Sequence, residues 1–275
     1  MNLREETEFL INQNVLKANK KLGQNFLINE DIIKEIAEKA EVSKEDVIIE
    51  IGPGLGSLTK ELLERAEKVI AIELDPNMAR ILKERFSLYN NFELIEEDVL
   101  KVNLQEIIKD YNSVKVVANL PYYITTPIVM KLLEDKLNLK SITVMVQKEV
   151  GERFSANPNG KEYGAITVSI NYYTKPEIII DVPKDNFDPI PEVDSCVIKL
   201  DVRNVPPVKI KDEKKFFKLI KAAFSQRRKT INNSLTCIGK TKEEIKKILD
   251  DLNIDTNLRA ENLSIEDFAK ISNNI

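Results

Sequence analysis

The chain has 275 residues, of which 43% are hydrophobic and 31% charged, a composition typical of folded globular proteins and not of disordered or fibrous ones. It contains no histidine, which excludes Ser-His-Asp triads, Cys-His dyads, histidine metal clusters and an imidazole general base. The net charge of −4 disfavours general binding of polyanions, so a nucleic-acid partner would need a local basic patch.

The sequence also predicts a cellular compartment. Residues 1–14 include three glutamates and no apolar segment of the kind found in secretory signals, and apolar runs elsewhere are no longer than strands. The two cysteines, Cys196 and Cys237, are too far apart in the sequence to indicate a disulfide framework or a structural zinc site. We therefore expect a cytoplasmic protein without a membrane segment and without a bound metal.

Short β-branched runs alternate with longer segments of helical periodicity between Val47 and Val202. This alternation is typical of parallel βαβ units with helices on both faces of the sheet. Ser57, Asp75 and Thr126 stand where helix N-caps are expected. The predicted strands are 47–51, 69–74, 92–96, 115–118 and 142–146, and the predicted helices are 31–39, 57–65, 76–86 and 127–135.

Two segments near the end of this region, 165–173 and 195–202, have no predicted helix between them, so we expect an antiparallel pair that closes the sheet. The two prolines in Asn-Val-Pro-Pro at 204–207 then interrupt the pattern and predict a domain boundary near residue 205. We therefore predict a Rossmann-like α/β domain over 1–205 and a small all-helical domain over 206–275. Its predicted helices are 213–224, 241–252 and 264–273.

Gly52, Gly54 and Gly56 follow the first predicted strand directly and precede a helix. Glycine permits positive φ and close approach of a ligand to the backbone, at a helix end that is electropositive. A tight turn without a ligand is the alternative. The dinucleotide pattern G-x-G-x-x-G requires a third glycine at position 57, where this chain has Ser57. Because S-adenosylmethionine has no pyrophosphate for the helix to hold, this spacing favours it over NAD.

Two acidic residues follow the next strands. Glu73 ends the second predicted strand, where a carboxylate can accept hydrogen bonds from ribose hydroxyls. Asp98 ends the third, where it can accept one from an adenine amine. Each alone is typical of a solvated surface acid. At the carboxyl ends of adjacent strands, however, the two together with the glycines indicate a crevice for an adenosyl group.

The tetrapeptide Asn119-Leu120-Pro121-Tyr122 ends the fourth predicted strand. An adenine N6 amine is a poor nucleophile because its lone pair is delocalised into the ring. The side-chain carbonyl of Asn119 and the backbone carbonyl of Leu120 could accept hydrogen bonds from the two N–H groups of this amine. These hydrogen bonds would localise the lone pair on the nitrogen. Pro121 stiffens the turn, and Tyr122 can stack on an extruded base. The alternative is a strand that ends in a proline turn with a core tyrosine.

Four motifs together resemble the KsgA (RsmA) family of small-subunit ribosomal RNA adenine dimethyltransferases. They occur in the family's order and spacing and span nearly the whole chain, at residues 21–27, 52–56, 119–122 and 223–230. The resemblance implies a class I methyltransferase fold, S-adenosylmethionine as cofactor and no metal. It further implies that two adjacent adenosines near the 3′ end of 16S rRNA are dimethylated within the pre-30S subunit.

The resemblance also assigns roles to single residues. Asn25 and Leu27 would cover the cofactor, and Gly52, with Gly54 beside it, would lie under its methionine part. Glu73 would hold the ribose and Asp98 the adenine. Asn119 would lie between the cofactor and the target base.

Basic residues concentrate near the C-terminus, where residues 214–247 contain 11 Lys and Arg and only two Glu. Arg227, Arg228 and Lys229 form the densest part and are predicted to contact phosphates. The lysines of 240–247 are more typical of a solvated helix face. A second cluster, Lys17, Lys20 and Lys21, could guide the backbone of the target nucleotide.

Phe154 is predicted to stack on the target base opposite Tyr122, with a core phenylalanine as the alternative. Two other functions stay open: a large-subunit rRNA dimethylase of the macrolide-resistance type, and an RNA-binding ribosome assembly factor. The motif at 225–230 and the long C-terminal region favour the small-subunit enzyme. The sequence has no conspicuous apolar surface stripe, and we expect a monomer.

Overall fold

The structure, a computed structural model, describes residues 2–13, 25–226 and 228–275. The chain forms two compact units. The first comprises Met1–Gly151 and Glu177–Val202, and the second Glu152–Pro176 and Arg203–Ile275. The division after Val202 lies close to the predicted boundary near residue 205. The second unit also takes in Glu152–Pro176, which the sequence pattern had placed in the first domain.

A seven-stranded sheet forms the centre of the first unit, in the order β4-β3-β2-β5-β6-β9-β7. Strands β4, β3, β2, β5 and β6 run parallel to one another, and β9 runs antiparallel to β6. The five predicted strands are confirmed to within one residue at each end. The strands are β2 (Val47–Ile51), β3 (Lys68–Glu73), β4 (Phe92–Glu96), β5 (Val114–Asn119), β6 (Ser141–Gln147), β7 (Thr174–Val182) and β9 (Ser195–Val202).

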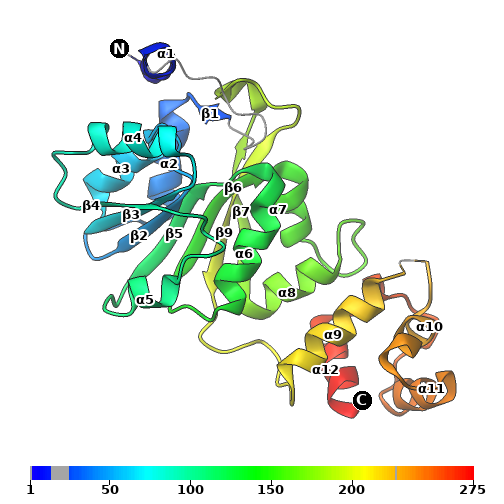
Figure 1. Ribbon diagram of the computed structural model, residues 1–275. Coiled ribbons are helices and arrows are strands. Elements are labelled where there is room, and N and C mark those ends of the chain that lie inside the picture. Colours follow the sequence, from blue (N-terminus) through cyan, green and yellow to red (C-terminus); the bar gives the residue numbers. More distant parts are fainter. Residues whose placement is uncertain (1, 14–24, 227) are drawn as a thin grey trace. The chain divides into compact units, whose positions relative to one another are not determined.

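Helices flank both faces of this sheet (Figure 1). Leucine, isoleucine and alanine side chains of three of them pack on valines and isoleucines of the strands, which buries the apolar stripe that the helical periodicity predicted. A separate two-stranded sheet pairs β1 (Phe26–Leu27) with β8 (Phe187–Asp188). The helices are α1 (Leu3–Gln13), α2 (Glu30–Lys39), α3 (Ser57–Arg65), α4 (Pro76–Arg85), α5 (Leu104–Ile108), α6 (Thr125–Glu134) and α7 (Lys148–Phe154).

One of the three predicted helix caps is confirmed. The Asp75 carboxylate accepts a hydrogen bond of 2.9 Å from the Asn77 N–H at the start of α4. The caps predicted at Ser57 and Thr126 are wrong. The N-cap position is one residue earlier, at Gly56, whose φ of +83° is not helical. Ser57 is therefore already the first residue of the helix. The turn that follows β5 continues directly into α6, which leaves no place for a capping side chain at Thr126.

The prediction of a strand over 165–173 is wrong, because these residues form helix α8 (Ala165–Tyr173) and the strand β7 begins directly after it. The segment is rich in β-branched and aromatic residues, which favour strands. Val168 and Tyr172, one helical turn apart, are buried together in the apolar core of the second unit. Tertiary packing therefore overrides the local preference.

Beyond Val202 the described residues form helices and turns around one apolar core. The three predicted helices are confirmed, and Thr241 and Ser264 cap the last two through their hydroxyls. None of the described helices has the length and apolar character needed to span a membrane. The main helices are α9 (Glu213–Phe224), α10 (Ile231–Ser234), α11 (Lys242–Asp251) and α12 (Ile265–Asn274).

Candidate functional site

A pocket opens in the first unit at the carboxyl ends of β2, β3, β4 and β5. Open parallel sheets bind ligands at this edge, because the loops that follow adjacent strands converge there. The residues predicted from sequence to hold a cofactor or to perform chemistry at this edge all line the pocket: Asn25, Leu27, Gly52, Gly54, Glu73, Asp98, Asn119, Leu120, Pro121 and Tyr122.

The glycine turn between β2 and α3 forms one wall. Gly52, Gly54 and Gly56 have φ values of +65°, +59° and +83°, a backbone conformation that residues with a Cβ rarely adopt. A Cβ atom on Gly52 would lie 3.7 Å from Cδ of Pro121, so this turn lies next to the turn that follows β5 and leaves room for one carbon between them. The backbone conformation, and not lack of space, is what requires glycine at position 52.

The Glu73 carboxylate is fixed by backbone amides. One oxygen accepts a hydrogen bond of 2.8 Å from the Asp75 N–H, and the other accepts one of 3.3 Å from the Gly54 N–H. Burial raises the pKa of Glu73, while these hydrogen bonds oppose the rise. Each carboxylate oxygen has a further lone pair, so the group can also accept hydrogen bonds from two ligand hydroxyls.

The Asp98 carboxylate lies in the turn after β4. Its Oδ1 atom accepts a hydrogen bond of 3.0 Å from the Leu100 N–H, and its Oδ2 atom lies 4.0 Å from Nζ of Lys101. The side chain is about one-quarter exposed, at 26%, and lines the pocket. It is therefore oriented by its own turn and still accessible to a donor on a ligand.

Hydrogen bonds to neighbouring residues hold Leu120, Pro121 and Tyr122 of the tetrapeptide at 119–122, whereas the Asn119 side chain has none among the described residues. The Leu120 N–H donates to the Met145 carbonyl at 3.2 Å, and the Thr125 hydroxyl donates to the Pro121 carbonyl at 3.1 Å. The hydroxyls of Tyr122 and Ser195 share a hydrogen bond of 2.7 Å. Within the part of the chain that the structure describes, no hydrogen bond involves the Asn119 side-chain amide, which lines the pocket. This amide is thus available to a substrate.

The segment that enters β1 supplies another wall. Asn25 and Leu27 line the pocket, and Leu27 pairs with Phe187 of β8. A Cβ on Gly54 would lie 3.4 Å from the Phe26 ring, which places this segment against the glycine turn. The rest of its motif, 21–24, and the lysines at 17, 20 and 21 lie outside the described residues.

Glu50 is a pocket residue that sequence reasoning missed. It lies in β2, is 1% exposed, and its Oε2 atom has no hydrogen-bond partner among the described residues. Burial raises the pKa of Glu50 to about 8, and the negative charge of Glu73 adds to the rise. The available signal was the acidic residue itself, since it stands inside a strand whose other residues are all apolar.

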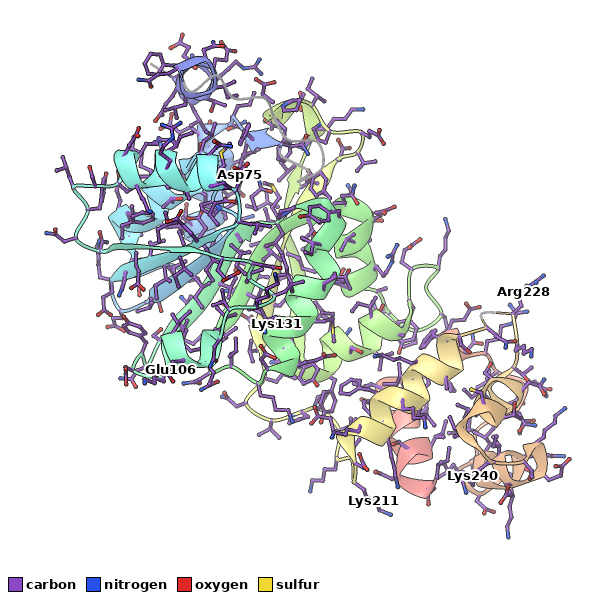
Figure 2. All side chains as sticks on the ribbon, viewed as in Figure 1. Asp75, Glu106, Lys131, Lys211, Arg228 and Lys240 are labelled. Atoms are coloured by element: carbon purple, nitrogen blue, oxygen red, sulfur yellow. The ribbon has the colours of Figure 1, made fainter. Side chains whose placement is uncertain are left out.

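The basic segment belongs to the second unit. Arg228 and Lys229 are exposed between α9 and α10, and Arg228 points away from both helices (Figure 2). Arg227 lies outside the described residues. The stacking role predicted for Phe154 is not supported, because this last residue of α7 is 0% exposed. A ring buried on all sides has no face for a base, so the core alternative fits.

Residues 15–275 match the family model described as ribosomal RNA adenine dimethylase. The ribosomal RNA small subunit methyltransferase A of Clostridium botulinum (strain Okra / Type B1) is 50% identical over 266 residues, which cover 97% of each chain. The protein of the same name from Alkaliphilus oremlandii (strain OhILAs) is 45% identical over 276 residues, which cover 98% of this chain and 96% of the relative.

Solved structures agree with these relatives. A dimethyladenosine transferase from Plasmodium falciparum superposes with a TM-score of 0.75 and 28% identity, covering 88% of this chain and 94% of that one. The 23S rRNA methyltransferase ErmE has a TM-score of 0.70 and 24% identity, covering 91% and 99%, a likeness that shows the fold. The family resemblance seen in the motifs is confirmed, and the chain belongs to the ribosomal RNA adenine dimethylase family.

Proposed function

We propose that this chain transfers methyl groups from S-adenosylmethionine to the N6 amine of adenines in small-subunit ribosomal RNA. The observation that carries the proposal is the Asn119 side chain, which lines the same pocket as the glycine turn and has no hydrogen bond among the described residues. Family membership supports adenine dimethylation. The relatives that share about half of its residues are named for the small subunit, which supports that choice of RNA.

The pocket residues fit S-adenosylmethionine. Glu73 offers two oriented oxygens for the ribose, Asp98 an acceptor for the adenine amine, and Gly52 a backbone without a side chain for the methionine part. The Oε2 atom of Glu50, buried in the same pocket without a hydrogen-bond partner among the described residues, is a further polar group that a bound ligand can satisfy. When bound, this cofactor supplies an electrophilic methyl group on a sulfonium.

The chain's own residues act on the nucleophile. The Asn119 side-chain carbonyl and the Leu120 backbone carbonyl accept hydrogen bonds from the two N6–H groups, which draws the lone pair out of the ring system. Pro121 holds the turn, and the Tyr122 ring stacks on the base. Burial raises the pKa of Tyr122, which keeps its phenol protonated at neutral pH, so it supplies no base, and acceptance by the two carbonyls is what activates the amine.

The finer proposal concerns the substrate. Two adjacent adenosines near the 3′ end of 16S rRNA would each receive two methyl groups in the pre-30S subunit, with the protein acting as a monomer. Arg228 and Lys229, exposed beside Arg227, would neutralise phosphates of that RNA. The motif resemblance supports this substrate, and the local excess of basic residues supports the RNA contact.

Labelled cofactor and undermethylated small subunits test the chemistry. Asn119→Ala should lower methyl transfer by at least about 100-fold, the usual consequence of removing a group that stabilises the transition state, while RNA affinity stays largely unchanged. Unchanged turnover would refute the mechanism. Primer extension on the modified RNA then locates the bases, and a block in large-subunit RNA alone would favour the macrolide-resistance type.

The salt dependence of RNA binding tests the basic segment. Arg227→Ala combined with Arg228→Ala should reduce the slope of log affinity against log salt by roughly 1.4 to 1.8, the equivalent of two phosphate contacts. Lys242→Ala combined with Lys246→Ala removes the same charge from α11 and is the matched control. An unaltered slope in the arginine variant would exclude this segment from the interface.

A further inference from the structure

One hydrogen bond joins the catalytic turn to a distant strand. The hydroxyl of Tyr122, in the turn after β5, lies 2.7 Å from the hydroxyl of Ser195, the first residue of β9 and 73 positions further along the chain. Ser195 is 0% exposed, whereas Tyr122 is partly buried in the pocket wall. The hydrogen bond therefore connects the pocket wall to β9, the strand that runs antiparallel to β6.

Ser195 is a fixed point in the first unit. It pairs with Gln147 across the ladder between β9 and β6. The preceding residue, Asp194, accepts a hydrogen bond of 3.0 Å from the Lys148 N–H through its carbonyl, and another of 3.0 Å from the Lys184 N–H through its side chain. The backbone that carries the serine is thus held by sheet and loop contacts that do not involve the pocket.

Tyr122 has less support from its own backbone. It belongs to a three-residue 3-10 turn, Tyr122–Ile124, and its phenol oxygen contacts the Ser195 hydroxyl. A ring on a short turn has two rotatable side-chain bonds, and a hydrogen bond at its far end restricts both. The same bond engages the phenol hydroxyl, and Tyr122 is one of the residues that line the pocket.

We propose that Ser195 is a positioning residue, which holds the Tyr122 ring in the orientation needed to stack on the target adenine. This inference rests on the proposed function, because it requires a base against that ring. Ser195 itself does not touch the base, and it acts only through the tyrosine. Burial raises the pKa of Tyr122, which agrees with an orienting role and not with a proton-transfer role for the phenol.

Kinetics of four variants test the coupling. Ser195→Ala and Tyr122→Phe each remove one partner of the same hydrogen bond, so each should lower kcat/KM for the RNA about fivefold, and the double variant should be no worse than either. Ser195→Thr, which keeps the hydroxyl, should retain most of the activity. Affinity for S-adenosylhomocysteine, measured without RNA, should be the same in all four proteins.

Ser141→Ala is the matched control. Ser141 is also buried, on β6 of the same sheet, but its hydroxyl has no hydrogen-bond partner among the described residues. Its replacement removes a buried hydroxyl without breaking a bond to Tyr122, and kcat/KM should stay within about twofold of the parent. If Ser141→Ala lowered kcat/KM as much as Ser195→Ala does, the loss would be due to a general disturbance of the sheet and not to the missing hydrogen bond to Tyr122.

A fluorescent base gives a readout independent of turnover. In RNA that carries 2-aminopurine at the target position, the fluorescence of this base should be quenched on binding as it stacks on the Tyr122 ring. The chain contains no tryptophan whose fluorescence would interfere. Ser195→Ala should leave the bound base brighter than the parent does. Unchanged kinetics and quenching in Ser195→Ala, or losses that multiply in the double variant, would refute the positioning role alone. A parent protein that neither methylates small-subunit RNA nor quenches the probe would refute the proposed function with it.

Discussion

Replacing Glu50 with glutamine tests the electrostatics of the pocket. The carboxyl is 1% exposed, and its pKa is about 8, against an ordinary 4.5. Between these two pH values the folded chain keeps a proton that the unfolded chain has released, so the free energy of unfolding falls as the pH rises. At about 1.4 kcal/mol per pKa unit, ionisation of the unfolded chain weakens folding by about 3 kcal/mol at pH 7.

Glutamine does not ionise, so Glu50→Gln should be more stable than the parent by up to about 3 kcal/mol at pH 7. The gain should shrink to nothing as the pH falls toward 4.5. Denaturant unfolding of the cofactor-free protein, followed by circular dichroism at several pH values between 5 and 8, measures the difference. Glu64→Gln on α3 is the control, because Glu64 is exposed and forms no ion pair with another described residue. A difference between Glu50→Gln and the parent that is constant with pH would refute the reasoning.

Three further predictions concern stability. Gly56→Ala should destabilise the protein by at least about 2 kcal/mol in the same unfolding assay, because φ is +83° and the new Cβ would lie 2.6 Å from the Phe86 ring. Gly151→Ala should cost about 1–3 kcal/mol, because its Cβ would lie 2.2 Å from Sγ of Cys196, and adding Cys196→Ala should restore most of the loss. Burial acts to raise the pKa of Asp46, but hydrogen bonds from Ser113, Lys115 and Ser43 outweigh it and hold the pKa at about 2. Asp46→Asn leaves buried Lys115 without its carboxylate, and the lowering of the Asp46 pKa from 3.8 to about 2 corresponds to a loss of about 2.5 kcal/mol above pH 4. This loss should fade as the pH falls through 2, and an equal loss at all pH values would contradict the reasoning.

Local patterns in the sequence were enough to place the pocket. Strand 47–51 and its glycines were located because a short β-branched run and a G-x-G-x-G turn depend on neighbouring residues only. Glu73, Asp98 and Asn119 could then be assigned to one edge, since the carboxyl ends of parallel strands meet at the same side of a sheet. The structure confirms that these residues line one pocket.

The remaining features depend on contacts between residues far apart in the chain. The strand-like segment 165–173 is helical because Val168 and Tyr172 are buried together in the core of the second unit, and Phe154 is buried although its sequence context permits exposure. The raised pKa of Glu50 results from its complete burial and from the nearby charge of Glu73. The hydroxyl of Tyr122 is held by a hydrogen bond to Ser195, which lies 73 residues further along the chain. The sequence by itself determined which glycines and polar residues follow the strands that end at the pocket, because that information is local. Only the tertiary structure decided which side chains are buried and what holds them, since those properties arise from packing between distant segments.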